Sequence, residues 1–167
     1  MTALDVRPAR VNELPLCSAL LQESARWAIE QGIPLWDEAS LTVEALTRSY
    51  HPAEFRLGWL EGEPVATMAL QREDPLFWPE ANPGEALYLH KLAVGRAYAG
   101  RGLAQAMLRA GLAEARSLNL PFLRLDTAAD RPKLRALYED FGFQSRGERQ
   151  VGVYRVVLYE LTVEPQR

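Results

Sequence analysis

The glycine-bearing stretch of residues 88–118 holds the residue types best suited to bind a phosphate group. A short apolar run, 88–94, leads into a turn, 95–102, that contains three glycines, and an Ala- and Leu-rich segment follows. This order predicts a strand, a loop and the first turn of a helix, where unpaired N–H groups and the helix dipole attract anions. Glycine lets an anion approach the backbone, and Arg96 and Arg101 add positive charge. The stretch therefore predicts a phosphate-binding loop.

The common nucleotide-binding motifs do not fit this loop. Gly95 and Gly100 have the spacing of a Walker A loop, but Arg101 and Gly102 replace its lysine and its magnesium-binding hydroxyl. A dinucleotide fingerprint matches at Gly100 and Gly102 and then fails at Gln105. We therefore discard a phosphate-loop nucleotide hydrolase.

Metal and covalent chemistry also find no support in the sequence. The chain has two histidines and one cysteine, with no Cys/His cluster, so we expect no metal site. It has no Gly-x-Ser-x-Gly elbow either. Cys17 lies in a predicted packed helix, and we interpret it as a small buried residue rather than a nucleophile.

Two motifs resemble the signature of the GNAT N-acetyltransferase superfamily. In the first, an apolar strand end, 92–94, precedes a glycine loop and a helix start, 99–104. In the second, a strand, 123–127, precedes a helix with a Leu-Tyr pair, 137–138, and a Gly-Phe ending, 142–143. The resemblance implies an α/β (α+β) fold with a mixed, mostly antiparallel central sheet and helices on both faces. A splayed parallel strand pair would form the acyl-coenzyme A cleft.

The resemblance further implies acetyl-coenzyme A (acetyl-CoA) as the acyl donor. The residues that it assigns to coenzyme binding are Leu92, Ala93, Val94, Ala99, Gly100, Arg101, Gly102, Leu103, Ala104, Arg131 and Lys133. Ala99 stands where the family usually has Gln or Arg, and Arg131 stands where Asn is usual, which removes a hydrogen-bond acceptor. Because the loop binds mainly through backbone N–H groups, we still expect coenzyme binding, with Arg131 or Lys133 supplying charge to the phosphates.

The implied reaction is direct transfer of an acetyl group to the primary amine of a small molecule or peptide. Tyr138 matches the tyrosine general acid of the family, since a phenol is protonated at neutral pH and can donate to a thiolate. The alternative is that Tyr138 is a core aromatic residue beside Leu134 and Phe141. The backbone N–H of Leu92 or Val94 is expected to stabilise the carbonyl oxygen.

The general base is less clearly marked. Many family members place a glutamate on the central strand, at the position that is Tyr88 in this chain. Strand alternation predicts that every second residue from Tyr88 to Val94 shares one face, so His90 points the same way. An imidazole could take the proton from the amine, directly or through a water. A structural role for His90 stays open, and other candidate bases lie in the preceding loop: Glu73, Asp74 and Glu85.

Acceptor specificity is expected from the connection of the first two helices, the loop before the central strand and the last strands. The residues proposed to contact the substrate are Trp36, Asp74, Trp78, Tyr88 and Tyr154, with Asp37 and Glu38 nearby. Each aromatic residue could instead serve only in packing. Trp27 and Trp59 are assigned to the core.

The elements that position these residues follow from hydrophobic periodicity and turn signals. The predicted helices are 12–31, with Asn12 as N-cap, 42–50, 103–118 and 131–141. The predicted strands are 4–7, 55–60, 64–71, 88–94, 121–127, 143–148 and 151–161. Residues 72–85 form a long loop, which in a compact domain is usually functional or disordered. The order predicts one α/β domain over 1–167.

Composition excludes several other classes of protein. The 167 residues carry a formal net charge of −3 without a basic patch, so no nucleic-acid partner is expected. No apolar window is long enough to span a bilayer and the N-terminus lacks a signal pattern, so we expect a cytoplasmic protein without membrane contact. A homodimer is possible. A non-catalytic acyl-CoA-binding sensor or interaction domain of the same fold remains the alternative to an enzyme.

Overall fold

The computed structural model describes residues 3–166, which belong to two compact units. The first unit comprises the chain up to Leu70 together with Lys91–Leu108. The second comprises Gln71–His90 together with the chain from Arg109 onward. The chain thus passes from the first unit to the second, returns, and passes over again. The expectation of a single domain over residues 1–167 stays a prediction.

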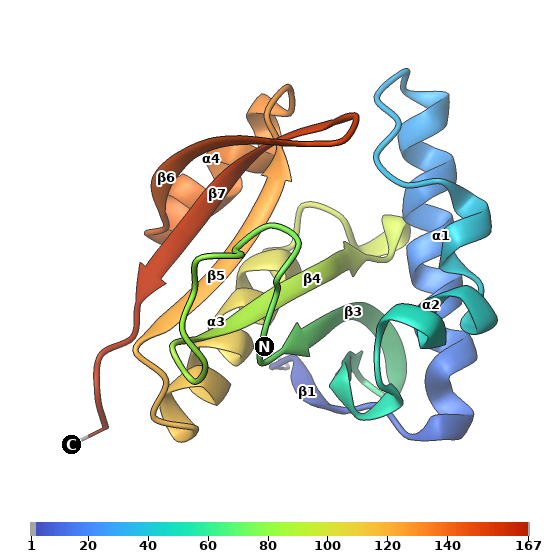
Figure 1. Ribbon diagram of the computed structural model, residues 1–167. Coiled ribbons are helices and arrows are strands. Elements are labelled where there is room, and N and C mark those ends of the chain that lie inside the picture. Colours follow the sequence, from blue (N-terminus) through green and yellow to red (C-terminus); the bar gives the residue numbers. More distant parts are fainter. Residues whose placement is uncertain (1–2, 167) are drawn as a thin grey trace. The chain divides into compact units, whose positions relative to one another are not determined.

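The first unit contains the N-terminal strands and helices (Figure 1). Its elements are β1 (Asp5–Pro8), α1 (Leu14–Glu30), α2 (Val43–Ser49), β2 (Phe55–Leu60), β3 (Glu63–Gln71), the end of β4 (Ala86–Val94), the start of α3 (Leu103–Ser117) and 3-10 turns at Val11–Glu13, Glu38–Leu41, Pro52–Glu54 and Arg96–Tyr98. Strand β2 pairs antiparallel with both β1 and β3. Glu61 and Gly62 join β2 to β3 with φ angles of 51° and 83°. Two positive φ angles define a type I′ hairpin turn, which joins the two strands predicted at 55–60 and 64–71.

Helix α1 begins later than the sequence predicts. Residues 11–13 form a 3-10 turn, the N-cap is Glu13 rather than Asn12, and Pro15 then occupies the first turn, where its missing N–H costs nothing. The buried face is Leu14, Cys17, Leu21, Ala25 and Ala28, whereas Ile29 is exposed. Burial raises the pKa of the Cys17 thiol, which supports its interpretation as a packed, unreactive residue.

The second unit contains the start of β4, the end of α3 and the C-terminal elements (Figure 1). These are β5 (Phe122–Ala128), α4 (Pro132–Phe141), β6 (Gln144–Val151) and β7 (Tyr154–Thr162). Strand β4 pairs parallel with β5, while β7 pairs antiparallel with both β5 and β6. The strand order of the sheet is β1-β2-β3-β4-β5-β7-β6. A mixed, mostly antiparallel sheet with one parallel pair confirms the predicted fold class.

Strand β4 contains a backbone irregularity that the sequence does not reveal. Lys91 has a φ angle of +55°, in the left-handed region that non-glycine residues rarely adopt. A residue in this conformation interrupts the alternation of side chains along a strand. The expectation that Tyr88, His90, Leu92 and Val94 all share one face is therefore wrong beyond His90. The regular part of β4 in the second unit ends at the histidine.

Apolar packing occurs within each unit. In the first unit, the α1 face packs with residues such as Leu41, Phe55 and Leu57. Trp59 is partly buried and packs against this cluster, as its assignment to the core predicts, whereas Trp27 is partly buried outside the cluster, which corrects its assignment. In the second unit, Trp78 and Tyr88 belong to one buried cluster whose other members are Ala86, Val156 and Leu158. Among the residues that the structure describes, no helix is long and apolar enough to cross a membrane.

Candidate active site

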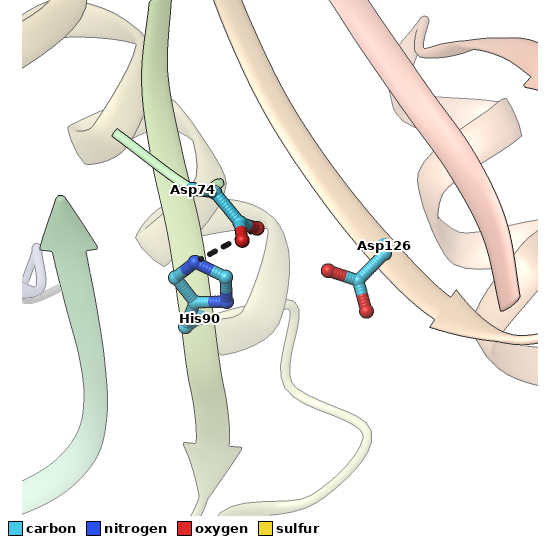
Figure 2. A group of neighbouring side chains, drawn as sticks. All are labelled: Asp74, His90 and Asp126. Carbon is cyan, nitrogen blue, oxygen red and sulfur yellow. Dashed lines mark ion pairs between the residues drawn. The ribbon is translucent and has the colours of Figure 1, made fainter. Parts of the chain in front are cut away.

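Three ionisable side chains of the second unit face one another just beyond the paired part of β4 and β5, which ends at Tyr88 and Arg124 (Figure 2). One imidazole nitrogen of His90 and one carboxylate oxygen each of Asp74 and Asp126 lie within 4.8 Å of one another. His90 comes from β4, Asp126 from β5, and Asp74 from the loop before β4. Nε2 of His90 lies 3.5 Å from Oδ2 of Asp74, and both side chains are largely buried, at 15% and 7% exposure. The sequence singled out Asp74 and His90 separately. The sequence analysis missed Asp126. The available signal was an acidic residue near the end of a predicted strand, next to Thr127.

Tyr138 lies within the same unit, on α4, and is buried. Its ring contacts those of Phe143 and Tyr159 at centroid distances of 6.0 Å. Burial and, to a lesser extent, the negative charge of Asp126 raise the pKa of the Tyr138 phenol well above its ordinary value. The N–H groups of Gly142 and Phe143 both donate to the Tyr138 carbonyl, which ends the helix and fixes this residue. The phenol is thus kept protonated within the electrostatic reach of the cluster of Asp74, His90 and Asp126.

A buried arginine joins several side chains of the second unit. Arg124 of β5 is 6% exposed; its Nη1 donates to Glu85 at 2.8 Å and to the Tyr88 hydroxyl at 3.0 Å, and its Nε donates to Glu160 at 2.9 Å. Hydrogen bonding from Arg124 is the main reason that the pKa of Glu85 is lowered, while burial raises the pKa of Tyr88. The Arg124 guanidinium also lies 4.6 Å from the Trp78 ring centroid. The sequence analysis missed this residue, although a charge inside the apolar run Leu-Arg-Leu was the available signal.

The loop between β3 and β4 is ordered and forms a pocket. Arg149 of β6 holds it by donating to the Phe77 carbonyl at 3.0 Å and by pairing with Glu80 at 2.8 Å. The pocket has a volume of about 260 Å³ and is lined by Arg72, Glu73, Asp74, Pro75, Trp78, Pro79, Ala81, Asn82, Pro83, Gly84 and Tyr88. Three residues predicted to contact the substrate, Asp74, Trp78 and Tyr88, therefore meet at one pocket. The Trp78 and Tyr88 rings lie 6.1 Å apart.

The other two predicted substrate residues lie elsewhere. Trp36, in the first unit, is partly buried beneath the Lys91 ammonium, 5.2 Å from its ring centroid. Tyr154 begins β7 and is 62% exposed. Within the second unit, Tyr154 does not line the pocket formed by the loop before β4.

The predicted coenzyme loop lies in the first unit and has the geometry of an anion-binding turn. Gly100 and Gly102 have φ angles of +78° and +76°, and a Cβ atom added at Gly100 would meet no other atom within 4 Å. The first hydrogen bond of α3 is donated by the Ala106 N–H to the Gly102 carbonyl at 3.1 Å. The backbone N–H groups that precede Ala106 in the first turn therefore have no partner within the helix. This exposed, glycine-formed helix start fits a pyrophosphate.

Side chains around this loop supply both apolar walls and charge. Its residues from Ala99 to Gly102 are exposed, Leu103 is buried and Ala104 is partly buried; on the strand, Ala93 is buried and Leu92 and Val94 are partly buried. The Arg96 guanidinium stacks 3.7 Å from the centroid of the Trp27 ring. The Arg96 N–H donates to Glu23 at 2.7 Å. The guanidinium of the second loop arginine, Arg101, lies over the Tyr98 ring, 5.3 Å from its centroid.

The two basic residues predicted to reach the coenzyme phosphates belong to the second unit. Arg131 is the N-cap residue of α4, and its guanidinium pairs with the Asp130 carboxylate at 3.0 Å. Lys133 lies in the first turn of the same helix and is exposed. Both residues therefore stand at a helix N-terminus, where an anion is favoured.

Comparison with known proteins agrees with this arrangement. The chain matches the Acetyltransferase (GNAT) family over residues 21–143. It is 26% identical over 163 residues to the uncharacterized N-acetyltransferase YesJ of Bacillus subtilis, covering 94% of this chain and 90% of YesJ.

Solved structures show the same fold. A GNAT-family acetyltransferase from Listeria monocytogenes has a TM-score of 0.77 at 22% identity, covering 97% of this chain and 98% of the other. The yncA structure from Salmonella typhimurium, solved with its cofactor acetyl-CoA, has a TM-score of 0.66 at 13% identity, covering 99% and 97%. These findings confirm the resemblance that the two sequence motifs indicate. The chain belongs to the GNAT family of acetyltransferases, enzymes that take their acetyl group from acetyl-CoA.

Proposed function

We propose that this acetyltransferase transfers the acetyl group of acetyl-CoA directly to the primary amine of a small molecule or peptide. The bond from the amine nitrogen to the acetyl carbon forms as the bond from that carbon to sulfur breaks. The amine loses a proton and the leaving sulfur gains one. The observation that carries the proposal is the cluster of Asp74, His90 and Asp126, whose charge also reaches Tyr138.

His90 is the proposed general base. Its Nε2 faces the Asp74 carboxylate, which can orient the imidazole and stabilise its protonated form. Glu85 is a weaker candidate because its hydrogen bond with Arg124 lowers its pKa, and a carboxylate of lowered pKa accepts a proton less readily. Glu73 is exposed, so water would compete for its proton-accepting oxygens. The same geometry makes Asp74 a positioning residue rather than the base.

Tyr138 is the proposed donor to the leaving sulfur. Its raised pKa keeps the phenol protonated throughout the neutral pH range, so the donor is always available. The same shift makes it a weaker acid than a free phenol. We therefore assign to Tyr138 the donation of a hydrogen bond that strengthens as charge develops on the sulfur, with the proton following.

The coenzyme is proposed to bind at the glycine loop that begins α3. When bound, acetyl-CoA supplies an activated thioester. The backbone around Gly100 and Gly102 would hold the pyrophosphate, and the N–H of Leu92 or Val94 stays the predicted donor to the carbonyl oxygen. Arg131 or Lys133 is proposed to add charge for the phosphates. If titration of Arg131→Ala and Lys133→Ala with acetyl-CoA at low salt shows wild-type affinity for both, this last assignment fails.

The alternative is an acyl-CoA-binding sensor without transferase activity, as Ala99, Arg131 and Tyr88 depart from the usual family residues. The two functions are separated by measuring thiol release from acetyl-CoA across a panel of primary amines. We expect release that depends on the amine. Binding of acetyl-CoA without amine-dependent release would support the sensor. A cytoplasmic location and a homodimer are further proposals, and analytical ultracentrifugation tests the dimer.

A further inference from the structure

Two of the side chains that line the pocket of the loop before β4 each contain a buried polar atom without a hydrogen-bond partner in the described part of the chain. Asp74 and Trp78 both line this pocket and are 8% and 6% exposed. Neither Oδ2 of Asp74 nor Nε1 of Trp78 has a hydrogen-bond partner among the described residues. A buried polar group without a partner is destabilising, so such a pair in one pocket indicates that a ligand supplies the missing groups.

The Asp74 oxygen specifies a cationic donor. Oδ1 of Asp74 already accepts the Phe77 N–H at 3.2 Å. Oδ2 faces Nε2 of His90 at 3.5 Å, beyond the usual range of a nitrogen-to-oxygen hydrogen bond. An ammonium group would be attracted to this carboxylate, and its nitrogen would then lie beside the proposed base.

The Trp78 nitrogen specifies an oxygen acceptor. An indole N–H can only donate, so the partner that completes its bond must be an oxygen such as a hydroxyl or a carbonyl. The position of this ring is fixed from two sides, because Trp78 packs against Tyr88 and lies beneath the Arg124 guanidinium. The donor is therefore held in place before any ligand arrives.

The pocket is small, and part of its wall is a stiff loop. Its volume of about 260 Å³ is below the roughly 300–1,000 Å³ of pockets that hold drug-sized molecules. Three prolines, Pro75, Pro79 and Pro83, form part of its wall and restrict the loop backbone. A short molecule fits such a pocket better than an extended peptide does.

We propose that the acceptor is a small primary amine that also carries an uncharged oxygen acceptor, of the amino alcohol or amino amide class. This inference rests on the proposed function and narrows its acceptor from any amine to this class. The ammonium binds at Asp74 beside His90, and the oxygen accepts from Nε1 of Trp78. Specificity then comes from recognition of both the amine and the oxygen of one small ligand.

The test is a comparison of amino alcohols, from ethanolamine to 6-aminohexan-1-ol, with the unsubstituted alkylamines of the same length. Thiol release from acetyl-CoA gives kcat/KM for each. We expect at least one amino alcohol to exceed its matched alkylamine by about tenfold, the size of one net hydrogen bond. Trp78→Phe keeps an aromatic ring but removes the N–H, so it should abolish that preference. Trp59→Phe is the matched control, because Nε1 of Trp59 is also buried without a partner but lies outside the pocket.

Asp74→Asn supplies the second arm of the test. It should raise the KM of every accepted amine, and it should weaken the rise in melting temperature that the best amino alcohol causes without acetyl-CoA. Asp140→Asn, on an exposed carboxylate of α4, should change neither quantity. This thermal shift reports ligand binding even where turnover is lost.

The outcomes separate the two proposals. Transfer to peptide amines with no small amine accepted overturns the inference and leaves the proposed function intact. An amino alcohol preference that persists in Trp78→Phe also overturns it. The absence of amine-dependent release with every amine tested overturns the proposed function as well, whereas a preference removed only by Trp78→Phe supports both.

Discussion

Nε2 of His90 lies 3.5 Å from Oδ2 of Asp74, and the carboxylate that makes this contact comes from the loop before the strand that carries the histidine. Two side chains separated by fewer than twenty residues thus meet because the loop folds back onto β4 (Figure 2). The distance allows electrostatic attraction and leaves room for a shift that would complete a hydrogen bond. An imidazole held in this way is oriented before an acceptor binds, which suits the role of general base proposed for His90.

His90→Ala is expected to lower kcat/KM by about 10²–10⁴, the usual contribution of a positioned general base. The acidic limb of the pH–rate profile should disappear with it, while the affinity for acetyl-CoA measured by calorimetry should stay unchanged. His51→Ala is the control, because His51 is exposed and its Nδ1 caps a 3-10 turn in the first unit. Retention of the acidic limb in His90→Ala would exclude His90 as the base.

Tyr138→Phe is expected to lower kcat while leaving acetyl-CoA affinity near the wild-type value. The substitution removes only the hydroxyl, so the ring packing with Phe143 and Tyr159 survives. Tyr159→Phe provides a matched control. The Tyr159 ring is adjacent to that of Tyr138, and this substitution also removes a single hydroxyl, one that donates a hydrogen bond to Glu139. Stopped-flow measurement of a single turnover separates chemistry from product release, and wild-type chemistry in Tyr138→Phe would remove its role.

The raised pKa of Tyr138 also predicts how stability changes in alkali. Burial and the charge of Asp126 hold the folded-state pKa above the ordinary value of about 10. Above that pH the unfolded chain loses a proton that the folded chain keeps, so this contribution to stability is complete below pH 10 and declines as the pH rises. Urea unfolding between pH 9 and pH 11 should show a steeper loss in the wild type than in Tyr138→Phe. Equal slopes in the two proteins would contradict the shift.

Much of the fold follows from local sequence signals. The turn at Glu61 and Gly62, the helix end at Gly142 and the N-cap at Thr42 each depend on residues a few positions apart, and they lie at the boundaries of elements that the sequence predicts. The glycine loop proposed to bind the coenzyme is of the same kind, because Gly100 and Gly102 adopt positive φ angles that other residues avoid.

The features that the sequence does not predict depend on contacts between distant residues. Asp126 meets His90 only because β5 pairs with β4, and Glu160 meets Arg124 only because β7 pairs with β5. The positive φ at Lys91 is equally hidden, since lysine carries no preference for that conformation. Single-residue patterns cannot show such pairings, because they arise from the register of the sheet.

Arg124→Met is expected to destabilise the protein by about 3–5 kcal/mol, because it leaves the buried Glu160 carboxylate and the Tyr88 hydroxyl without their shared partner. Arg146→Met is the control. Arg146 pairs with the same Glu160, but its side chain is 49% exposed, so its loss should cost no more than about 1 kcal/mol. Urea unfolding at pH 7 gives both values. Similar free energies of unfolding for the two variants would show that the buried hydrogen bonds of Arg124 contribute no more to stability than the exposed ion pair of Arg146.

Gly100→Ala is expected to weaken acetyl-CoA binding by more than its cost in stability explains. Gly100 has a φ angle of +78°, and no neighbouring atom would obstruct an added Cβ, so the folding cost is only the backbone strain of about 1–2 kcal/mol. The added methyl group would nevertheless stand on the exposed surface where the pyrophosphate is proposed to approach. Gly62→Ala imposes the same strain at φ +83° in the β2–β3 turn, with open space around it. Calorimetric titration should therefore show a loss of acetyl-CoA affinity in Gly100→Ala and none in Gly62→Ala, while thermal unfolding shows comparable destabilisation in both. Equal affinities in the two variants would mean that the backbone at Gly100 does not contact the coenzyme.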